Sequence, residues 1–264
     1  MTEEEDSILA TMKKTHSPST RASCPVRRPL TVVSIMAHQD DEMRCLGTLL
    51  KCRARGDRLA FVVLTDGSAG VLANPPLSRA AAARIRRREM KALACALGAA
   101  YVCLGERDEF LYDTPDVRMA LIEAIRRTKA DVIFTHYSAD YNEDHVTTHR
   151  LVKHCAMLAS LPLLPTSSSP LQAHPALFCV EPHGPIPFAA THFVDISDVE
   201  AEKVRLLPLH ASQEDAMQKA LKTGFDKLCG CPDAYWGQKV GCEFAEPFAS
   251  MESRGAVKPY AVLP

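Results

Sequence analysis

Residues Leu30-Thr-Val-Val-Ser-Ile-Met36 form the first apolar run of this 264-residue chain, and Ala37-His-Gln-Asp-Asp-Glu42 follows it directly. The run is rich in β-branched residues and lacks polar–apolar alternation, which is typical of a strand buried on both faces. In open α/β sheets, ligands bind beyond the carboxyl ends of the strands. We therefore expect the histidine and the carboxylates after Met36 at the ligand-binding edge of a sheet.

The rest of the chain alternates between helix-like and strand-like segments. Helical spacing over 42–55 stops at Gly56, and a second buried strand is expected at 59–64. Further segments follow in order: a helix at 78–97, a strand at 100–104, a helix at 117–128, a strand at 131–135, a helix at 144–158, strands at 176–180 and 192–196, and a helix at 199–207. This order predicts an α/β fold, a three-layer, Rossmann-like, mostly parallel sheet with helices on both faces. A dinucleotide-binding domain is excluded, because no G-x-G-x-x-G follows the first strand.

Composition narrows the class of protein. Residues 1–28 are polar and lack periodicity, so we expect a mobile arm there and a single domain over 29–264. The formal charge of −1 argues against nucleic-acid binding. No apolar run approaches the ~20 residues that span a bilayer, and no signal peptide is recognised, so the sequence predicts a cytoplasmic protein without a membrane partner.

Ten cysteines are scattered between Cys24 and Cys242. Disulfide scaffolds are typical of short secreted chains, and most of these cysteines lie in apolar stretches, where they act as small hydrophobic residues. Cys229 and Cys231 form a C-x-C pair with no second pair at zinc-finger spacing. The sequence therefore favours free thiols over disulfides or a structural zinc knuckle.

A second polar segment, His136-Tyr-Ser-Ala-Asp-Tyr-Asn-Glu-Asp-His145, follows the strand expected at 131–135. Two strand ends of one sheet thus each supply histidine and aspartate, which lets distant segments form one metal site. Three such ligands with an open position are typical of catalytic zinc, although iron or another divalent ion fits the same donors. Taken alone, the first segment is explained equally well by Asp40 or Asp41 as a helix N-cap.

Residues 37–42 resemble the Ala-His-Pro-Asp-Asp-Glu signature of the PIG-L/LmbE-type family of zinc-dependent N-deacetylases. The resemblance extends from about Thr31 to Phe248. Three further segments fit the family pattern in the right order: Leu64-Thr-Asp-Gly67, Asp144-His145 before a helix, and Phe193-Val-Asp-Ile-Ser197 leading through Lys203 to His210-Ala-Ser-Gln213.

The resemblance implies that His38, Asp41 and His145 bind Zn2+ and that Asp40 is the general base. A metal lowers the pKa of a bound water to roughly 7, so a neighbouring carboxylate can take its proton at neutral pH, and the hydroxide attacks the amide. Asp144 is expected either to orient His145 or to cap its helix.

Two positions depart from the family pattern. Gln39 replaces a proline, which removes a rigid turn but no reactive group, and we expect little effect. Asn142 stands where many members have a histidine that stabilises the oxyanion or supplies a proton. Its amide can donate a hydrogen bond but cannot act as an acid near pH 7. Either Asp40 serves as both base and acid, or His183 in the loop Glu181-Pro-His-Gly-Pro supplies the proton; an ordinary loop histidine is the alternative.

Other residues are candidates for ligand or substrate binding. His149 lies one helical turn after His145 and is a second-ranked ligand, whereas His136 can simply be packed or hydrogen-bonded. Asp66 follows the second strand and can bind a sugar hydroxyl. Arg87, in the basic run at 84–88, can hold a sugar or phosphate, and Trp236 can stack on a sugar ring. Exposed ion pairing and packing are the alternative roles.

The resemblance therefore implies a hydrolase that removes the N-acetyl group from an N-acetylglucosamine-type amino sugar or small soluble conjugate, and a homo-oligomer, either trimer or hexamer. A thiol-sugar conjugate amidase and a catalytically silent sugar-binding protein are the alternatives. The silent protein gains support only from the missing histidine at 142. Residues 161–175, rich in proline and serine, are expected to form an exposed loop that mediates subunit contacts or covers the pocket.

Overall fold

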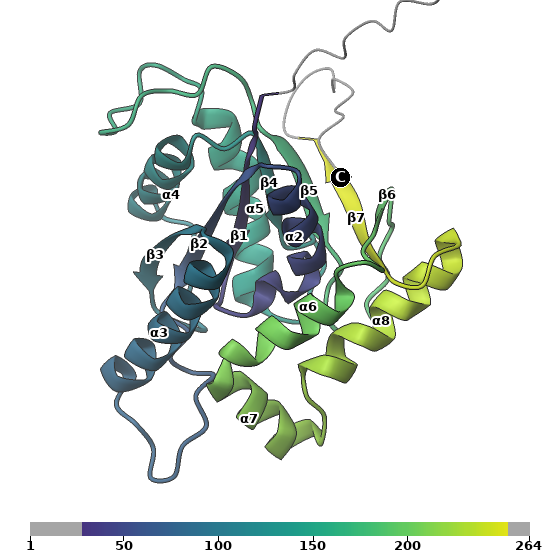
Figure 1. The fold of residues 1–264 in the computed structure, drawn as a ribbon. Coiled ribbons are helices and arrows are strands. Elements are labelled where there is room, and N and C mark those ends of the chain that lie inside the picture. The colour runs from purple at the N-terminus through teal and green to yellow at the C-terminus, as the bar shows by residue number, and fades with distance from the viewer. Residues whose placement is uncertain (1–27, 253–264) are drawn as a thin grey trace, which may run out of the picture.

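The computed structural model describes residues 28–252, so the predicted arm lies almost wholly outside it. Seven strands form one sheet in the order β3-β2-β1-β4-β5-β7-β6 (Figure 1). Neighbouring strands among β1 to β5 run parallel, and β7 runs antiparallel to both β5 and β6. The predicted α/β class and mostly parallel sheet are confirmed.

Six of the seven strands, β1 to β6, lie close to their predicted positions. The strands are β1 (Thr31–Met36), β2 (Arg58–Thr65), β3 (Ala100–Glu106), β4 (Val132–Thr135), β5 (Ala176–Val180), β6 (His192–Asp195) and β7 (Ala245–Met251). The helical elements are η1 (Asp41–Arg44), α2 (Leu46–Ala54), α3 (Arg79–Leu97), α4 (Pro115–Thr128), α5 (Glu143–Leu158), α6 (Glu200–Leu206), η2 (Leu207–Leu209), α7 (Ala211–Leu221) and α8 (Phe225–Val240). The sequence patterns missed α7, α8 and β7.

Two apolar clusters fill the space between the sheet and its helices. One contains residues of α2, α3, α6 and α8, and the other contains residues of α4 and α5, so the helices cover both faces of the sheet (Figure 1). Val32 and Val33, adjacent in β1, belong to different clusters, because successive side chains of a strand point to opposite faces. This explains why β1 shows no polar–apolar alternation.

The helix expected at 42–55 is two elements. The 3-10 turn η1 ends at Cys45, whose φ of −138° breaks the helical backbone before α2. The carboxylate of Glu246 in β7 then accepts hydrogen bonds from the amides of Gly47 (2.9 Å) and Thr48 (2.7 Å). An acceptor at this position satisfies amides that have no partner within the helix. The start of α2 is therefore determined by a residue about 200 positions away in sequence.

Residues 161–175 do not cover the carboxyl ends of the strands. Buried Arg126 holds this loop by donating to the carbonyls of Leu161 (2.5 Å) and Leu164 (3.0 Å). The loop helps to line a hollow of about 810 Å³ together with Asp131 and Arg58, at the amino ends of β4 and β2. The expectation that the loop covers the predicted pocket is therefore wrong, because the loop lies at the opposite edge of the sheet.

No helix between residues 28 and 252 is long and apolar enough to cross a lipid bilayer.

A buried ion cluster joins α6, α8 and β7. Lys203 is fully buried, and its Nζ lies 2.8 Å from Glu246 Oε1 and also contacts Asp233. Burial opposes the charged form, but the two carboxylates outweigh it and raise the pKa of Lys203. Because Glu246 also binds the amides of α2, this cluster ties the C-terminal elements to the first helix after β1.

We expect Lys203→Met to lower the free energy of unfolding by about 3–5 kcal/mol, because it leaves two buried carboxylates without their counter-charge. Urea denaturation followed by circular dichroism measures the change. The control, Lys51→Met, removes an ion pair with the exposed Asp198 and should cost less than about 1 kcal/mol. Equal losses for both variants would contradict this assignment.

Candidate metal centre

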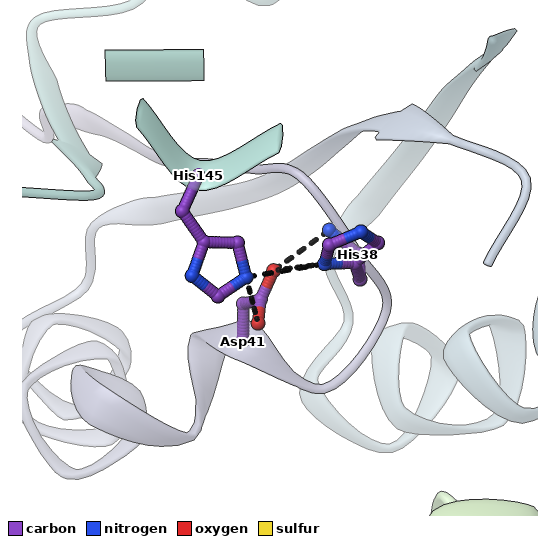
Figure 2. Close-up of side chains that lie close together, drawn as sticks. All are labelled: His38, Asp41 and His145. Carbon is purple, nitrogen blue, oxygen red and sulfur yellow. Dashed lines mark hydrogen bonds and ion pairs between the residues drawn. The ribbon is translucent and has the colours of Figure 1, made fainter. Parts of the chain in front are cut away.

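The three predicted ligands converge at one edge of the sheet. His38 and Asp41 follow β1, and His145 lies in the first turn of α5, which follows β4. β1 and β4 are parallel neighbours, so their carboxyl ends lie side by side. His38 Nδ1 is 3.2 Å from His145 Nε2 and 3.3 Å from Asp41 Oδ2 (Figure 2). His145 Nε2 is 3.3 Å from Asp41 Oδ1.

These separations fit a tetrahedral ion. Ligand atoms bonded to zinc at about 2.0–2.1 Å in a tetrahedron stand about 3.3–3.4 Å from one another. His38 Nδ1 and His145 Nε2 lie 3.2 Å apart, and each lies 3.3 Å from one carboxylate oxygen of Asp41, Oδ2 for His38 and Oδ1 for His145. Two imidazole nitrogens and one carboxylate oxygen are also a donor set that zinc accepts. The three residues can therefore hold a zinc ion with a fourth position left for water or substrate.

The second ring nitrogen of each histidine faces a carboxylate. His38 Nε2 lies 3.0 Å from Asp108 Oδ1, and His145 Nδ1 lies 3.0 Å from Asp140 Oδ1. Metal-binding histidines commonly direct their remaining N–H toward such a group, which sets the tautomer and the ring orientation. The arrangement leaves Nδ1 of His38 and Nε2 of His145 as the ligand atoms. Neither Asp108 nor Asp140 was singled out from the sequence, although both follow strands at this edge.

Negative charge dominates this cluster. Burial opposes protonation of His145, but Asp41 and Asp140 raise its pKa to about 9. The pKa of His38 also lies well above its usual range, because Asp108, Asp144 and Asp41 outweigh its burial. His136 behaves differently: burial lowers its pKa to about 4, and its Nε2 accepts the amide proton of Ala37 at 3.0 Å. The first two histidines thus lie where the surroundings favour a positive charge, which a bound cation supplies.

Asp40, the predicted general base, lies beside the ligands in a left-handed backbone conformation with φ of 109°. Arg86 Nη2 of α3 lies 2.7 Å from its Oδ1 and also donates to the carbonyl of Gln39. Burial raises the pKa of Asp40 to about 6, with Arg86 acting in the opposite direction. Asp40 therefore carries its charge above about pH 6 and keeps Oδ2 without a hydrogen bond among the described residues.

Gln39 does more than the sequence suggested. It is fully buried, and its Nε2 donates to the carbonyl of Thr65 at 3.3 Å. This bond joins the end of β1 to the end of β2, where a proline would offer no donor. Gln39 therefore makes a contact between two strand ends that the sequence did not indicate.

A cavity of about 220 Å³ opens over the three candidate metal ligands. It is lined by His38, Asp40, Asp41, Gly67, Gly70, Arg86, Asp108, Glu109, Tyr141, Asn142, His145 and Gln213. Burial raises the pKa of Tyr141 to about 12, so its hydroxyl keeps its proton at neutral pH. The cavity thus combines carboxylates, one buried guanidinium and a phenol around the three ligand candidates.

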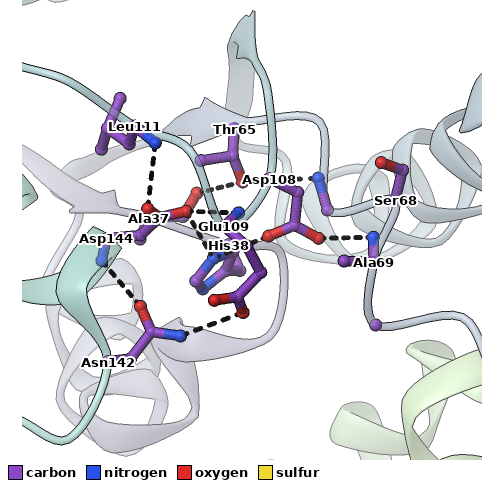
Figure 3. A network of polar contacts seen from close by, with 12 residues as sticks. Ala37, His38, Thr65, Ser68, Ala69, Asp108, Glu109, Leu111, Asn142 and Asp144 are labelled. Atoms are coloured by element: carbon purple, nitrogen blue, oxygen red, sulfur yellow. Dashed lines mark hydrogen bonds and ion pairs between the residues drawn. The ribbon is translucent and has the colours of Figure 1, made fainter.

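Asn142 lines this cavity but acts first as a helix cap. Its Oδ1 accepts hydrogen bonds from the amides of Asp144 (2.8 Å) and His145 (3.3 Å), and its Nδ2 donates to Glu109 Oε1 at 3.2 Å (Figure 3). Asp144, expected to cap the helix or to orient His145, does neither. Its carboxylate accepts the amide protons of Glu109 and Leu111 and lies 3.4 Å from His38 Nε2.

Three predicted substrate-binding residues lie outside the lining of the cavity. Asp66 is occupied by Arg79, whose Nε lies 2.6 Å from its carboxylate. Arg87 is exposed, and its neighbour Arg86 lines the cavity instead. Trp236 donates to Glu181 Oε1 at 2.8 Å and packs against Phe193. Arg86 and not Arg87 thus lines the cavity, because adjacent helical residues point about 100° apart.

Two histidines also lie outside the cluster of ligands. His183 Nδ1 is 2.7 Å from Arg44 Nη2, and burial followed by the Arg44 charge lowers the pKa of His183. His183 does not line the cavity. His149 Nδ1 contacts the carbonyl oxygen of His136 at 2.9 Å, and His149 belongs to none of the groups of side chains close enough to share an ion.

Residues 33–156 match the family model PIG-L, described as GlcNAc-PI de-N-acetylase. The conserved protein TT1542 from Thermus thermophilus is 29% identical, with 86% of this chain and 97% of that chain covered and a TM-score of 0.72. The N,N'-diacetylchitobiose deacetylase from Pyrococcus horikoshii is 22% identical, with 95% and 94% covered and a TM-score of 0.73. No curated protein matches the chain.

A third solved structure has the same fold but another printed activity. GalB, the 4-carboxy-2-hydroxymuconate hydratase from Pseudomonas putida, is 21% identical, with 88% of this chain and 100% of that chain covered and a TM-score of 0.73. The matches confirm the predicted resemblance and the fold. Because hydratase and deacetylase share the fold, the chemistry must be argued from the site.

We expect Asp140→Asn to weaken zinc binding 10- to 100-fold, because His145 loses the carboxylate that faces its Nδ1. Competition with a chromophoric chelator measures the dissociation constant. Asp113→Asn removes a carboxylate paired with Arg118 outside the cavity and serves as the control. The same zinc affinity in Asp140→Asn and in the unaltered protein would contradict the orienting role.

Proposed function

We propose that this chain is a member of the PIG-L family of deacetylases and a metal-dependent hydrolase that removes the N-acetyl group from an N-acetylglucosamine-type amino sugar or small soluble conjugate. One observation carries the proposal. Ligand atoms of His38, Asp41 and His145 lie within 4.8 Å of one another, with the two ring nitrogens 3.2 Å apart as in a tetrahedral zinc site, and Asp40 lines the same cavity. A base beside three metal ligands suits hydrolysis of an amide.

Asp40 and Arg86 have separate roles in the proposed hydrolysis. When bound, zinc supplies the Lewis acidity that lowers the pKa of a water molecule to about 7 and polarises an amide carbonyl. Asp40 Oδ2 takes the proton of the attacking water, while Arg86 holds Oδ1 and so fixes the carboxylate plane. The pKa of Asp40, raised by burial to about 6, keeps this group ready to accept a proton near neutral pH.

Breakdown of the tetrahedral adduct needs a proton on the leaving nitrogen. Asn142 has no acidic proton near pH 7, and its amide is held by α5 and Glu109. His183 faces Arg44 and does not line the cavity. We therefore assign the proton to Asp40, which returns to the amine the proton it took from water as the C–N bond breaks, so that acetate and free amine are the products.

The cavity supports a small substrate. Its volume of about 220 Å³ and its polar lining suit an acetamido group and part of one sugar ring. Tyr141 and Gln213 offer donors, and Asp108 and Glu109 offer acceptors, for hydroxyl groups. A thiol-sugar conjugate amidase would use the same catalytic residues. The complete set of ligands and base leaves the silent sugar-binding protein without structural support.

We expect Asp40→Asn to lower kcat for acetate release by about 10²- to 10⁴-fold while zinc content stays unchanged, because only the base is removed. The assay measures acetate from N-acetylglucosamine, its dimer, its phosphates and its nucleotide conjugate, with and without chelator and added zinc. Asp116→Asn, in the exposed first turn of α4, is the control for loss of one carboxylate. Unchanged turnover in the zinc-loaded Asp40→Asn variant would refute the role of Asp40.

A further inference from the structure

Glu109 holds a backbone conformation that suits glycine. It follows Asp108 in the loop after β3, with φ of 64°. This left-handed region is unfavourable for a residue with a Cβ, and such residues cluster at functional sites. Asp144 imposes the turn, because its carboxylate accepts the amide protons of Glu109 at 2.8 Å and Leu111 at 3.0 Å (Figure 3). The turn explains the backbone conformation but does not explain a glutamate there.

The side chain of Glu109 is held against the wall of the cavity. Its Oε1 accepts a hydrogen bond from Asn142 Nδ2 at 3.2 Å. The side-chain amide of Asn142 is kept from rotating by 180°, because its Oδ1 caps α5 by accepting from the amides of Asp144 and His145. An oxygen of Glu109 also lies within 4.8 Å of a ring nitrogen of His38. Asn142 therefore directs the exposed Glu109 carboxylate toward the candidate metal ligands.

The side chains that line the cavity carry mostly negative charge, which bears on the charge of the substrate. Besides the ligand Asp41, the cavity is lined by the carboxylates of Asp40, Asp108 and Glu109. Arg86 is the one arginine or lysine in the lining, and it is buried and already contacts Asp40. A bound divalent cation and Arg86 together still leave the four carboxylates of the lining in excess by about one negative charge. A substrate phosphate or carboxylate would thus meet net negative charge, whereas hydroxyl or ammonium groups would find acceptors.

We propose that Glu109 is a specificity-determining residue for the hydrolysis argued above. Its carboxylate, held by Asn142, accepts hydrogen bonds from hydroxyl or ammonium groups of the substrate and repels anionic substituents. The substrate class is then uncharged or cationic amino sugars, such as short or partly deacetylated N-acetylglucosamine oligosaccharides, in place of sugar phosphates or nucleotide sugars. This inference rests on the proposed deacetylation for its kinetic test only.

The kinetic test compares kcat/KM for the N-acetylglucosamine dimer and for N-acetylglucosamine 6-phosphate in the zinc-loaded full chain. We expect the unaltered protein to prefer the dimer and Glu109→Gln to lower that preference at least about tenfold, because the variant keeps the shape but loses the charge. Glu143→Gln, an exposed neighbour outside the cavity lining, should keep the preference. An unchanged ratio in Glu109→Gln, or an equal change in Glu143→Gln, would overturn the proposal.

A binding test separates this inference from the proposed function. If the unaltered zinc-loaded protein releases no acetate from any substrate, the deacetylase proposal fails, and calorimetric titration with glucosamine and glucosamine 6-phosphate still tests Glu109. We expect the unaltered protein to prefer glucosamine and Glu109→Gln to weaken glucosamine binding about tenfold. Equal binding by the two proteins, or no binding by either, would overturn the role of Glu109.

A thermal-stability measurement tests whether the side chain of Glu109 stabilises the fold. Glu109→Gly relieves the left-handed strain and removes the carboxylate. We expect Tm to stay unchanged or rise by up to about 3 °C while the preference for uncharged substrates falls. A fall in Tm of more than about 3 °C would show that Glu109 serves the fold, and it would overturn the specificity role.

Discussion

Buried negative charge at the carboxyl ends of β1 and β4 is the constraint on which the rest of the site depends. Asp40 and Asp41 lie in the turn after β1, where Asp40 pairs with Arg86 of α3 and Asp41 faces His38 and His145. Further carboxylates face both imidazole rings. Buried charges are costly unless they are paired. A divalent cation between the two histidines and Asp41 would neutralise this cluster, and both rings present a nitrogen toward that point.

Distant elements hold this cluster in place. Asp144 and Asn142 join the start of α5 to the loop after β3, so the segment that supplies His145 also positions Asp108 and Glu109. On the other side, Glu246 caps α2 and pairs with Lys203, which steadies the turn that carries Asp40 and Asp41. The C-terminal strand thus contributes to the geometry of a site formed mostly by the first 145 residues.

Local patterns were enough to predict β1 to β6, most of the helices and the convergence of His38, Asp41 and His145. Buried strands are recognisable as apolar runs, and the candidate ligands are recognisable as polar residues that directly follow such runs. Long-range contacts were not predictable. β7 contains Pro247 and a buried glutamate whose partner is 43 residues away, so it lacks the pattern of a strand. Arg86 was passed over for Arg87 because both faces of α3 carry arginines and packing alone decides which one is buried. The Asn142 cap was readable, since an asparagine before two acidic residues is typical of a helix start.

The most direct test of the metal centre is the zinc content of the full chain together with the X-ray absorption spectrum of the bound ion. We expect one zinc per chain, bound by nitrogen and oxygen atoms with the scattering signature of two imidazoles and no sulfur. Zinc that fails to reach one ion per chain at saturation, or that shows sulfur ligands from the cysteines, would contradict a centre formed by His38, Asp41 and His145.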